Sequence, residues 1–529
     1  MPVVDTLSSA GSAAGEESTS GAVAGAETTA GGGSVLPAAR RKWLPGPQGL
    51  VIVVAAVAGA RLGLRPISDN STLVHLRTGI DLVRTWHVPR SDPYSYTAPG
   101  HPWVVQSWFA SLLYGLANSA GHHALVLEQG VIMAGVGAAI AMAARSTTAW
   151  RSGLAALLAI AASAPGWSPR PLMFELGCLA LLIVVVERRA SPLWLIPIMW
   201  VWVNTHGSWP IGLAWLAARG VGEAIDLRGW PRRALVAGAG LAAGLAISLV
   251  NPLTWRLITF PLVAVQKRST FQGIVEWRSP NFQSPNSFLV LIFITLALVV
   301  LLRARLPWAQ LLPVCGFFPL GLVAERNLAP FGVVLAPALA AALAGPSAHW
   351  PTGWAGWAAT GWERIEDWAQ AVVRVSGSVI VRVAAVVAAL GVTGGLVVLA
   401  LGRPTLRLDE YPVAATAFLD RTGRLTAAHR IAAVDVVGCF LIWRAGPRVK
   451  VFIDDRYDMY PAPVVAAAGV LSAGVGAGVS QALDRYRVDT VLWSEAGVLP
   501  GTLLQQGGWR EVYSDGTWVV LERVPGSSA

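Results

Sequence analysis

The chain has 529 residues, of which 54% are hydrophobic and only 13% are charged, and its mean hydropathy is +0.54. Apolar runs of about 17–25 residues, each long enough to cross a bilayer, recur along it, which excludes a soluble globular protein. The net charge of +10 does not indicate nucleic-acid binding, because the basic residues lie between apolar runs, where they orient helices and meet membrane lipids. No basic-aromatic module of a DNA or RNA binder is present in the sequence.

Residues 1–44 are predicted to be a disordered cytoplasmic tail. They consist largely of Ser, Ala, Gly, Thr and Glu and cannot bury enough apolar surface to offset the entropy of ordering. A secretory signal is not expected, because the first apolar run starts late. The basic run Arg40-Arg41-Lys42 precedes the first predicted span at residues 49–64, so the positive-inside rule predicts a cytoplasmic N-terminus.

Residues 65–120 form the predicted first outer loop, which is far too polar to enter the bilayer. Within it, residues 69–86 have the apolar spacing of an amphipathic helix. Asn70 or Ser71 is a suitable residue to cap the start of that helix. A polar, helix-bearing loop held against the membrane is the first place at which we expect chemistry.

Residues 103–120 decide the topology. Polar side chains make this stretch a weak span, and a crossing there would put the later basic loops outside, against the positive-inside rule. If the stretch lies on the outer surface as a helix, those loops fall inside, and we expect this arrangement. It gives about eleven spans and an outer C-terminus. After the first, the spans are predicted at residues 122–143, 152–166, 171–187, 191–205, 208–219, 233–250, 286–302, 307–323, 328–344 and 379–401.

Two further segments complete the predicted organisation. Residues 350–374, which are rich in Trp, are predicted to form an amphipathic helix lying on the membrane. The predicted fold class is therefore an α-helical polytopic membrane domain, residues 45–401, followed by an outer soluble α/β domain, residues 402–529. In the outer domain, strand-like runs alternate with helical ones, and a hairpin turns at Asp515-Gly516; the strand-like runs are 449–453 and 490–493, and the helical runs are 464–472 and 480–486.

Asp69 is the first candidate for chemistry, because it lies about one turn beyond the first span, at the outer interface. A carboxylate at that place can accept the proton of a hydroxyl group as a general base, as glycosyl transfer requires. The alternative is that Asp69 caps the following helix and complements its dipole. The residues alone leave both interpretations open.

His206 and Arg326 are candidates because each is a polar residue beside an apolar run. His206 lies in a polar break between two such runs, which is costly at that depth unless the break lines a cavity or pairs with protein groups. The alternative for His206 is a satisfied structural turn. Arg326 opens a span from the outer side and is placed to reach a lipid phosphate, the alternative being that it snorkels toward water.

The predicted outer loop at residues 251–285 carries Arg256, Lys267, Glu276 and Trp277. Basic side chains suit a phosphate group and an aromatic ring suits a sugar, but loop charges also occur simply because they are well solvated. In the outer domain, three aspartates follow a strand-like run, where they suit a cation or a sugar; pairing with Arg456 is the more common arrangement. These aspartates are Asp454, Asp455 and Asp458.

No P-loop, GxGxxG, HExxH or Ser-His-Asp pattern is present, which argues against an ATP-driven transporter and a soluble-type hydrolase. Several other motifs are present, and together they resemble one protein family. They are Asp69 with His75-Leu76-Arg77-Thr78-Gly79, Pro89-Arg90-Ser91-Asp92-Pro93-Tyr94, Asn204-Thr205-His206-Gly207, Asn251-Pro252, Glu276-Trp277-Arg278, Glu325-Arg326-Asn327 and, in the outer domain, Phe452-Ile453-Asp454-Asp455-Arg456. This set resembles bacterial GT-C-type polytopic membrane glycosyltransferase-like proteins with a C-terminal extracytoplasmic domain, over most of the chain after the tail.

The resemblance implies a glycosyltransferase on the outer face of the bacterial inner membrane. Its donor would be a polyprenyl-phosphate-linked sugar and its acceptor an envelope glycan or glycolipid. A divalent cation remains an open cofactor, and no nucleotide cofactor is expected, because nucleotide sugars are cytoplasmic. Asp69 would be the catalytic base and the other candidates would bind substrate: His75, Arg77, His206, Arg256, Lys267, Glu276, Trp277 and Arg326.

The chain departs from the family pattern at three places. Ser71 stands where a second Asp is often found, Val74 stands where Trp is usual, and Val437-Gly438-Cys439-Phe440 replaces Trp-Gly-Gly-Tyr. These departures favour the alternative function, a non-catalytic envelope scaffold or glycolipid-binding protein of the same fold. A secondary transporter is a more distant alternative, because we find no inverted repeat of broken helices in the sequence.

Overall fold

The computed structural model describes residues 44–121, 123–271, 274–302, 304–344 and 355–526. The predicted disordered tail and the start of the Trp-rich segment fall almost entirely outside these residues. Of the Trp-rich segment, the structure describes a helix, α15 (Ala355–Ser376). Its predicted position on the membrane surface stays a prediction.

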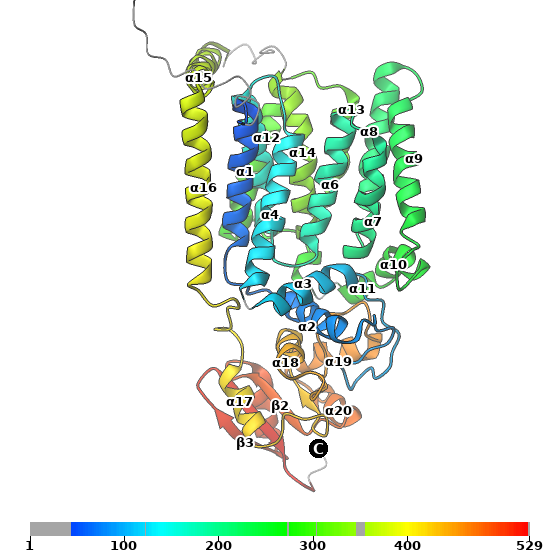
Figure 1. Ribbon diagram of the computed structural model, residues 1–529. Helices are drawn as coiled ribbons and strands as arrows, with labels where there is room; N and C mark the ends of the chain where they lie inside the picture. The colour runs from blue at the N-terminus through cyan, green and yellow to red at the C-terminus, as the bar shows by residue number, and fades with distance from the viewer. Residues whose placement is uncertain (1–43, 122, 272–273, 303, 345–354, 527–529) are drawn as a thin grey trace, which may run out of the picture. The chain divides into compact units, whose positions relative to one another are not determined.

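Each predicted span coincides with a helix of the described chain, as expected for apolar segments that must satisfy their own backbone groups in lipid. Figure 1 shows these helices side by side in a bundle. They are α1 (Pro47–Gly63), α4 (Ala124–Ala143), α5 (Ala149–Ser163), α6 (Leu172–Glu187), α7 (Leu195–Thr205), α8 (Pro210–Leu227), α9 (Arg232–Ile247), α12 (Pro285–Leu302), α13 (Trp308–Val323), α14 (Leu328–Ala344) and α16 (Val379–Leu401).

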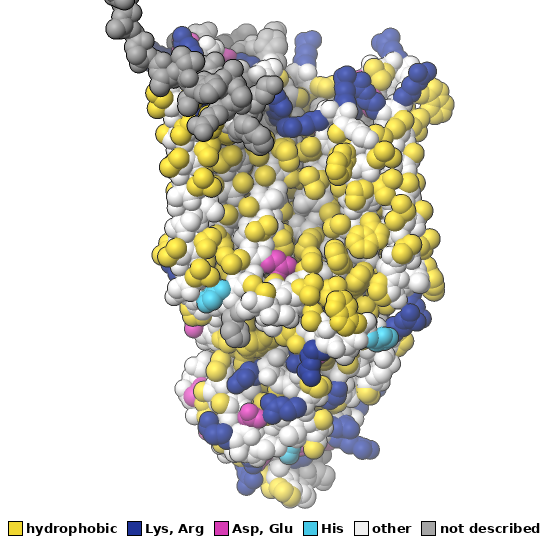
Figure 2. Space-filling view, viewed as in Figure 1, with side chains coloured by type: hydrophobic (Ala, Val, Ile, Leu, Met, Phe, Trp, Pro, Cys, Tyr) yellow, Lys and Arg dark blue, Asp and Glu magenta, His cyan; other side chains and the backbone are white. Residues whose placement is uncertain are grey.

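The helices do not by themselves give the number of membrane spans. Within the described residues, four segments are long and apolar enough to cross a membrane: Ala124–Ala143, Pro285–Leu302, Glu325–Ala344 and Val379–Leu401. The other helices of the bundle are shorter or less apolar, so the count of eleven stays a prediction. In Figure 2, hydrophobic side chains cover the visible face of the bundle. In α16, Ile380 is 79% and Leu390 68% exposed, as expected of a helix that faces lipid.

Small residues let the first helices approach closely. A Cβ atom at Gly59 of α1 would lie 2.1 Å from the carbonyl oxygen of Met133 in α4, so this contact requires glycine. The same device joins the two helices of the first loop, α2 (Asn70–Thr85) and α3 (Trp108–Ala120). A Cβ at Gly79 would lie 1.9 Å from the carbonyl oxygen of Ser111.

The helices α2 and α3 lie across the end of the bundle that adjoins the C-terminal domain (Figure 1). The predicted helix at 69–86 is confirmed, although its cap is Asp69 and not Asn70 or Ser71. The helix α3 packs along α2 and is not one of the parallel helices of the bundle, as expected for a surface helix. Short elements connect the longer helices elsewhere: η2 (Ala164–Gly166), η3 (Pro192–Trp194), α10 (Trp255–Gln266), α11 (Arg268–Phe271), η4 (Val275–Trp277) and η5 (Glu325–Asn327).

The C-terminal domain is α/β, as predicted. Its four-stranded sheet has the order β1-β2-β4-β3, in which only β1 and β2 are parallel, and the last two strands form the expected hairpin around Asp515-Gly516. Its elements are α17 (Val413–Arg421), β1 (Ile431–Ala432), α18 (Asp435–Ala445), α19 (Ala462–Ala473), α20 (Gly478–Arg485), β2 (Thr490–Ser494), α21 (Val498–Gln506), β3 (Trp509–Ser514) and β4 (Trp518–Arg523).

The prediction of a strand at residues 449–453 is wrong, because this run does not join the four-stranded sheet. Val451 makes only isolated bridges, one to Ile431 and one to Ser95 of the first outer loop. The run therefore links the outer domain to the loop. A buried cation strengthens this junction: the Arg456 guanidinium lies 2.9 Å from Asp92 of the loop and 2.7 Å from Asp454.

Candidate functional site

Asp69 uses both of its carboxylate oxygens. Oδ1 accepts the backbone N–H of Ser71 at 3.0 Å, which makes Asp69 the N-cap of α2. Oδ2 accepts the hydroxyl of Ser168 and lies 2.9 Å from Nε of Arg170. The capping interpretation is therefore confirmed, and the role as general base stays a prediction.

Arg170, which sequence reasoning missed, joins Asp69 to a second acid. Its guanidinium binds both oxygens of Glu276, at 3.1 and 2.5 Å, while Nε faces Asp69. Burial alone would lower the pKa of Arg170, but Asp69 and Glu276 raise it above its ordinary value, so the side chain stays charged. A signal was available: Arg170 lies in a short predicted outer turn, where the positive-inside rule disfavours basic residues.

Arg326 is a second cation near Glu276. Its guanidinium stacks over the ring of Trp277 at 4.5 Å. The elements η4 and η5 that carry the two residues are joined by a 2.9 Å backbone hydrogen bond from Glu325 to Arg278. Glu276 and Arg170 are both close enough to interact electrostatically with Arg326. Yet within the described part of the chain its guanidinium forms no ion pair and no hydrogen bond, so it is available to an anion.

Two histidines border the same region. Nδ1 of His206 lies 2.9 Å from Glu175, a carboxylate within α6, so the polar break at His206 is paired with a protein group. Nδ1 of His75 lies 3.0 Å from the Ser111 hydroxyl. Burial lowers the pKa of His75 to about 4, and Asp69, His206 and Arg170 all act on it, so these groups share one neighbourhood and His75 is neutral at neutral pH.

The structure thus brings together most of the predicted site residues at the junction of α2, α7, η4 and η5. They are Asp69, His75, His206, Glu276, Trp277 and Arg326, and we call them, with Arg170, the junction cluster. Glu175, like Arg170, was missed; its signal is a carboxylate within an apolar run, which is costly unless it is paired.

Three of the predicted site residues do not belong to the junction cluster. Arg77 forms a 2.5 Å ion pair with Asp81, one turn further along α2. The Lys267 ammonium group donates to the carbonyl oxygen of Asp458 in the C-terminal domain. Arg256 is exposed on α10. No described contact connects these three side chains to the cluster.

The C-terminal domain reaches the junction cluster through Asp455. The side chains of Ser71 and Cys439 lie beside this carboxyl group, and the Asn70 amide nitrogen lies 3.7 Å from the sulfur of Cys439. Burial raises the pKa of Asp455 to about 7, and Asp454 and Asp69 add to the increase. The predicted pairing with Arg456 is confirmed for Asp454, which binds that guanidinium twice at 2.7 Å.

The sequence leaves a divalent cation open as a cofactor, and such an ion requires a set of side chains that can bind it. Among the residues that the structure describes, no group of three or more His, Cys, Asp or Glu side chains is arranged to hold a metal ion. Metal dependence therefore stays untested.

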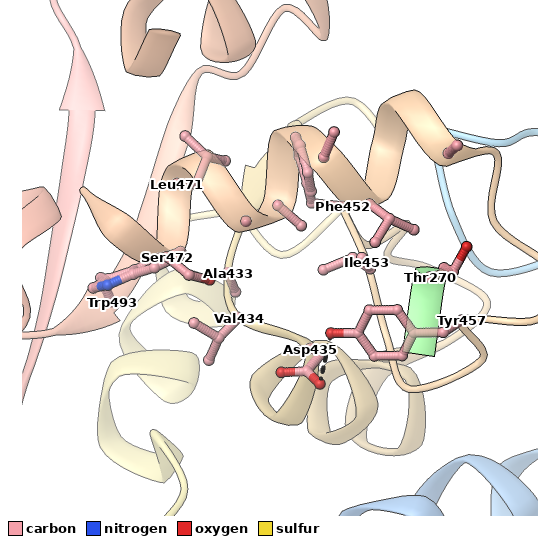
Figure 3. Close-up of a pocket in the computed structure, with 15 residues that line it drawn as sticks. Thr270, Ala433, Val434, Asp435, Phe452, Ile453, Tyr457, Leu471, Ser472 and Trp493 are labelled. Carbon is pink, nitrogen blue, oxygen red and sulfur yellow. Dashed lines mark hydrogen bonds between the residues drawn. The ribbon is translucent and has the colours of Figure 1, made fainter. Parts of the chain in front are cut away.

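A cavity of about 460 Å³ is lined by the C-terminal domain and by Thr270 of α11 (Figure 3). Its wall is mainly apolar, with Phe452 and Leu471 among the side chains that line it. Its polar part is Asp435, which accepts a 3.0 Å hydrogen bond from the Tyr457 hydroxyl. None of the predicted site residues lines this cavity.

No protein-family model and no curated protein matches the chain. Among solved structures, it is similar to ArnT from Cupriavidus metallidurans bound to undecaprenyl phosphate, with 16% identity, coverage of 90% of this chain and 98% of that chain, and a TM-score of 0.45. It is also similar to the oligosaccharyltransferase of Archaeoglobus fulgidus in the apo form, with 12% identity, coverage of 92% and 75%, and a TM-score of 0.48.

A third similar structure is AglB from Archaeoglobus fulgidus in complex with an inhibitory peptide and a dolichol-phosphate, with 14% identity, coverage of 91% and 74%, and a TM-score of 0.47. These proteins are GT-C glycosyltransferases, the class that the sequence resembles. Because identities are 12–16% and TM-scores are below 0.5, any functional conclusion must come from the residues of this chain.

Proposed function

We propose that the chain is a GT-C-type membrane glycosyltransferase that moves a sugar from a polyprenyl-phosphate donor to a cell-envelope acceptor on the outer face. The observation that carries this proposal is the state of Arg326. Its guanidinium is partly buried, stacks on Trp277 and is left without an ion pair among the described residues. A guanidinium held in this way binds a phosphate group well, through paired charge-assisted hydrogen bonds.

Arg170 does not compete for this role. Two carboxylates, Asp69 and Glu276, already neutralise it. The same two carboxylates repel a phosphate group from Arg170, so that an anion is favoured at Arg326. The ring of Trp277 backs the guanidinium and fixes its plane, so that little side-chain entropy is lost on binding.

The transfer also needs a proton acceptor, because the acceptor hydroxyl must lose its proton as its oxygen attacks the sugar. Two carboxyl groups near Ser71 are candidates for this role: Asp69, the N-cap of α2, and Asp455 of the C-terminal domain. A phosphate at Arg326 and a carboxylate on the other side of Arg170 are the two parts that glycosyl transfer from a lipid phosphate requires.

Lipid binding tests the proposal at Arg326. Purified protein in nanodiscs is titrated with undecaprenyl phosphate, and bound lipid is counted by native mass spectrometry. Arg326→Gln should weaken binding roughly 10- to 100-fold, the equivalent of about 1.5–3 kcal/mol for a charge-assisted contact. The control, Arg403→Gln, removes an exposed cation beyond α16 and should bind as the wild type does. Equal affinity in both variants would contradict the proposal.

One observation favours the alternative function, a glycolipid-binding protein without catalysis. The Asp69 carboxylate already has three donors, Ser71, Ser168 and Arg170, which is the state of a structural acid. The two functions differ in outcome: the alternative predicts binding of undecaprenyl phosphate that depends on Arg326, with no transfer of sugar.

A further inference from the structure

Two carboxyl groups lie on either side of Ser71, and they are held very differently. Asp69 accepts the Ser71 backbone N–H and the Ser168 hydroxyl, and it is paired with Arg170. Asp455 has the side chains of Ser71 and Cys439 as neighbours, and among the described residues its carboxyl group forms no ion pair. A carboxylate whose lone pairs are occupied by a cation and two further donors is a poor proton acceptor, whereas Asp455 retains acceptor capacity.

The position of Asp455 is firmly determined by its neighbours. Asp454 binds the Arg456 guanidinium, and Tyr460 donates to Asp454 at 2.6 Å. The next residue is thereby directed to the start of α2. Gly438 in α18 permits the close approach, since a Cβ there would lie 1.9 Å from the carbonyl oxygen of Ile453.

We propose that Asp455 of the C-terminal domain, and not Asp69, accepts the proton of the acceptor hydroxyl, an inference that rests on the proposed glycosyl transfer. In the step, the hydroxyl oxygen forms a bond to the anomeric carbon and its proton moves to Asp455. The bond from that carbon to the phosphate oxygen breaks, and its electron pair leaves with the polyprenyl phosphate at Arg326. Asp69 is a positioning residue, which holds Ser71 through the helix cap and Arg170 through the ion pair.

The electrostatic setting of Asp455 suits this role. Burial is the main cause that raises its pKa to about 7, and a base is most effective when its pKa lies near the working pH. The nearby charged and titratable groups are Asp454 and Asp69, which raise its pKa, Cys439, whose hydrogen bond lowers it, and Arg170, Tyr411 and Tyr457, which interact with it electrostatically.

The test compares Asp455→Asn and Asp69→Asn in membranes from a deletion strain, at matched protein level. The readout is incorporation of radiolabelled sugar from the host's polyprenyl-phosphate sugars into membrane glycan between pH 5.5 and 8.5. Wild-type transfer should rise as pH increases through about 7. Asp455→Asn should lower the transfer rate about 10²–10⁴-fold, the usual contribution of a general base. The increase of the rate with pH should also disappear in this variant.

Asp69→Asn should lose less and keep the rise, because Asn still caps α2 while the ion pair with Arg170 is lost. Glu511→Gln is the control, since it changes an exposed carboxyl group on β3 of the same domain, and it should behave as the wild type does. Near-normal transfer by Asp455→Asn, or a pH rise that disappears only in Asp69→Asn, would overturn the inference while leaving the transferase intact. Absence of any wild-type transfer and of undecaprenyl phosphate binding would instead overturn the proposed function.

Discussion

At the scale of single residues, neighbours in the sequence have opposite environments. Asp454 is fully buried and is balanced by Arg456, whereas Asp455 is partly buried without a cation of its own. Removing water from an unbalanced carboxyl group disfavours its ionised form. The pair therefore divides into a carboxyl group that a cation balances and one that no ion pair balances.

This difference predicts an unusual stability effect for Asp455→Asn. The pKa of Asp455 is raised from 3.8 to about 7 in the folded protein, so the folded state binds the proton more tightly than the unfolded state. The wild type therefore loses stability as pH rises from about 4 to about 7, and Asn removes that loss. We expect Asp455→Asn to be more stable than the wild type at pH 8, by a few kcal/mol at most, and nearly equal to it at pH 4.

Thermal unfolding in nanodiscs at the two pH values measures this effect. A variant that is less stable at pH 8 would show that Asp455 holds the domain in place, and that its loss of activity has a structural cause.

At the scale of elements, the crossing of α2 and α3 positions the first loop. The backbones meet at Gly79 and Gly115, where a Cβ on either residue would lie within 2.3 Å of a carbonyl oxygen. The contact between His75 and Ser111 lies one turn away on the same two helices. A change in this crossing should therefore shift the helix that begins at Asp69.

Gly79→Ala tests the crossing. Its methyl group would lie 1.9 Å from the carbonyl oxygen of Ser111, so the helices must separate, at a typical overpacking cost of about 1–3 kcal/mol. Gly135→Ala in α4 is the control, because a Cβ there meets no atom within 4 Å. Lower thermal stability for Gly79→Ala alone is expected; equal stability of the two variants would contradict the close crossing.

At the scale of the whole molecule, local patterns predicted the elements and missed most of the connections between them. Hydropathy located the helices of the bundle, and helical spacing located α2, because both signals lie within one segment. Asp455 is hundreds of residues from Ser71 in the sequence, so only the tertiary fold reveals their contact. The error at residues 449–453 has the same origin, since the partners of Val451 come from distant segments.

The junction cluster was predicted in part for a related reason. Asp69, His206 and Arg326 are polar residues beside apolar runs. Because a polar group in that setting costs free energy unless it is paired or functional, the sequence alone identifies them as candidates. Arg77 and Lys267 carry the same charge as Arg326, and only their contacts with Asp81 and with the carbonyl of Asp458 distinguish them from it.

The central claim is that the chain transfers sugar from a lipid phosphate held by Arg326. The most direct measurement is the amount of surface glycan in a deletion strain complemented by wild type, Arg326→Gln or Arg403→Gln, at matched protein level. The claim predicts that deletion removes a glycan, that wild type and Arg403→Gln restore it, and that Arg326→Gln does not. Full restoration of the glycan by Arg326→Gln would contradict it.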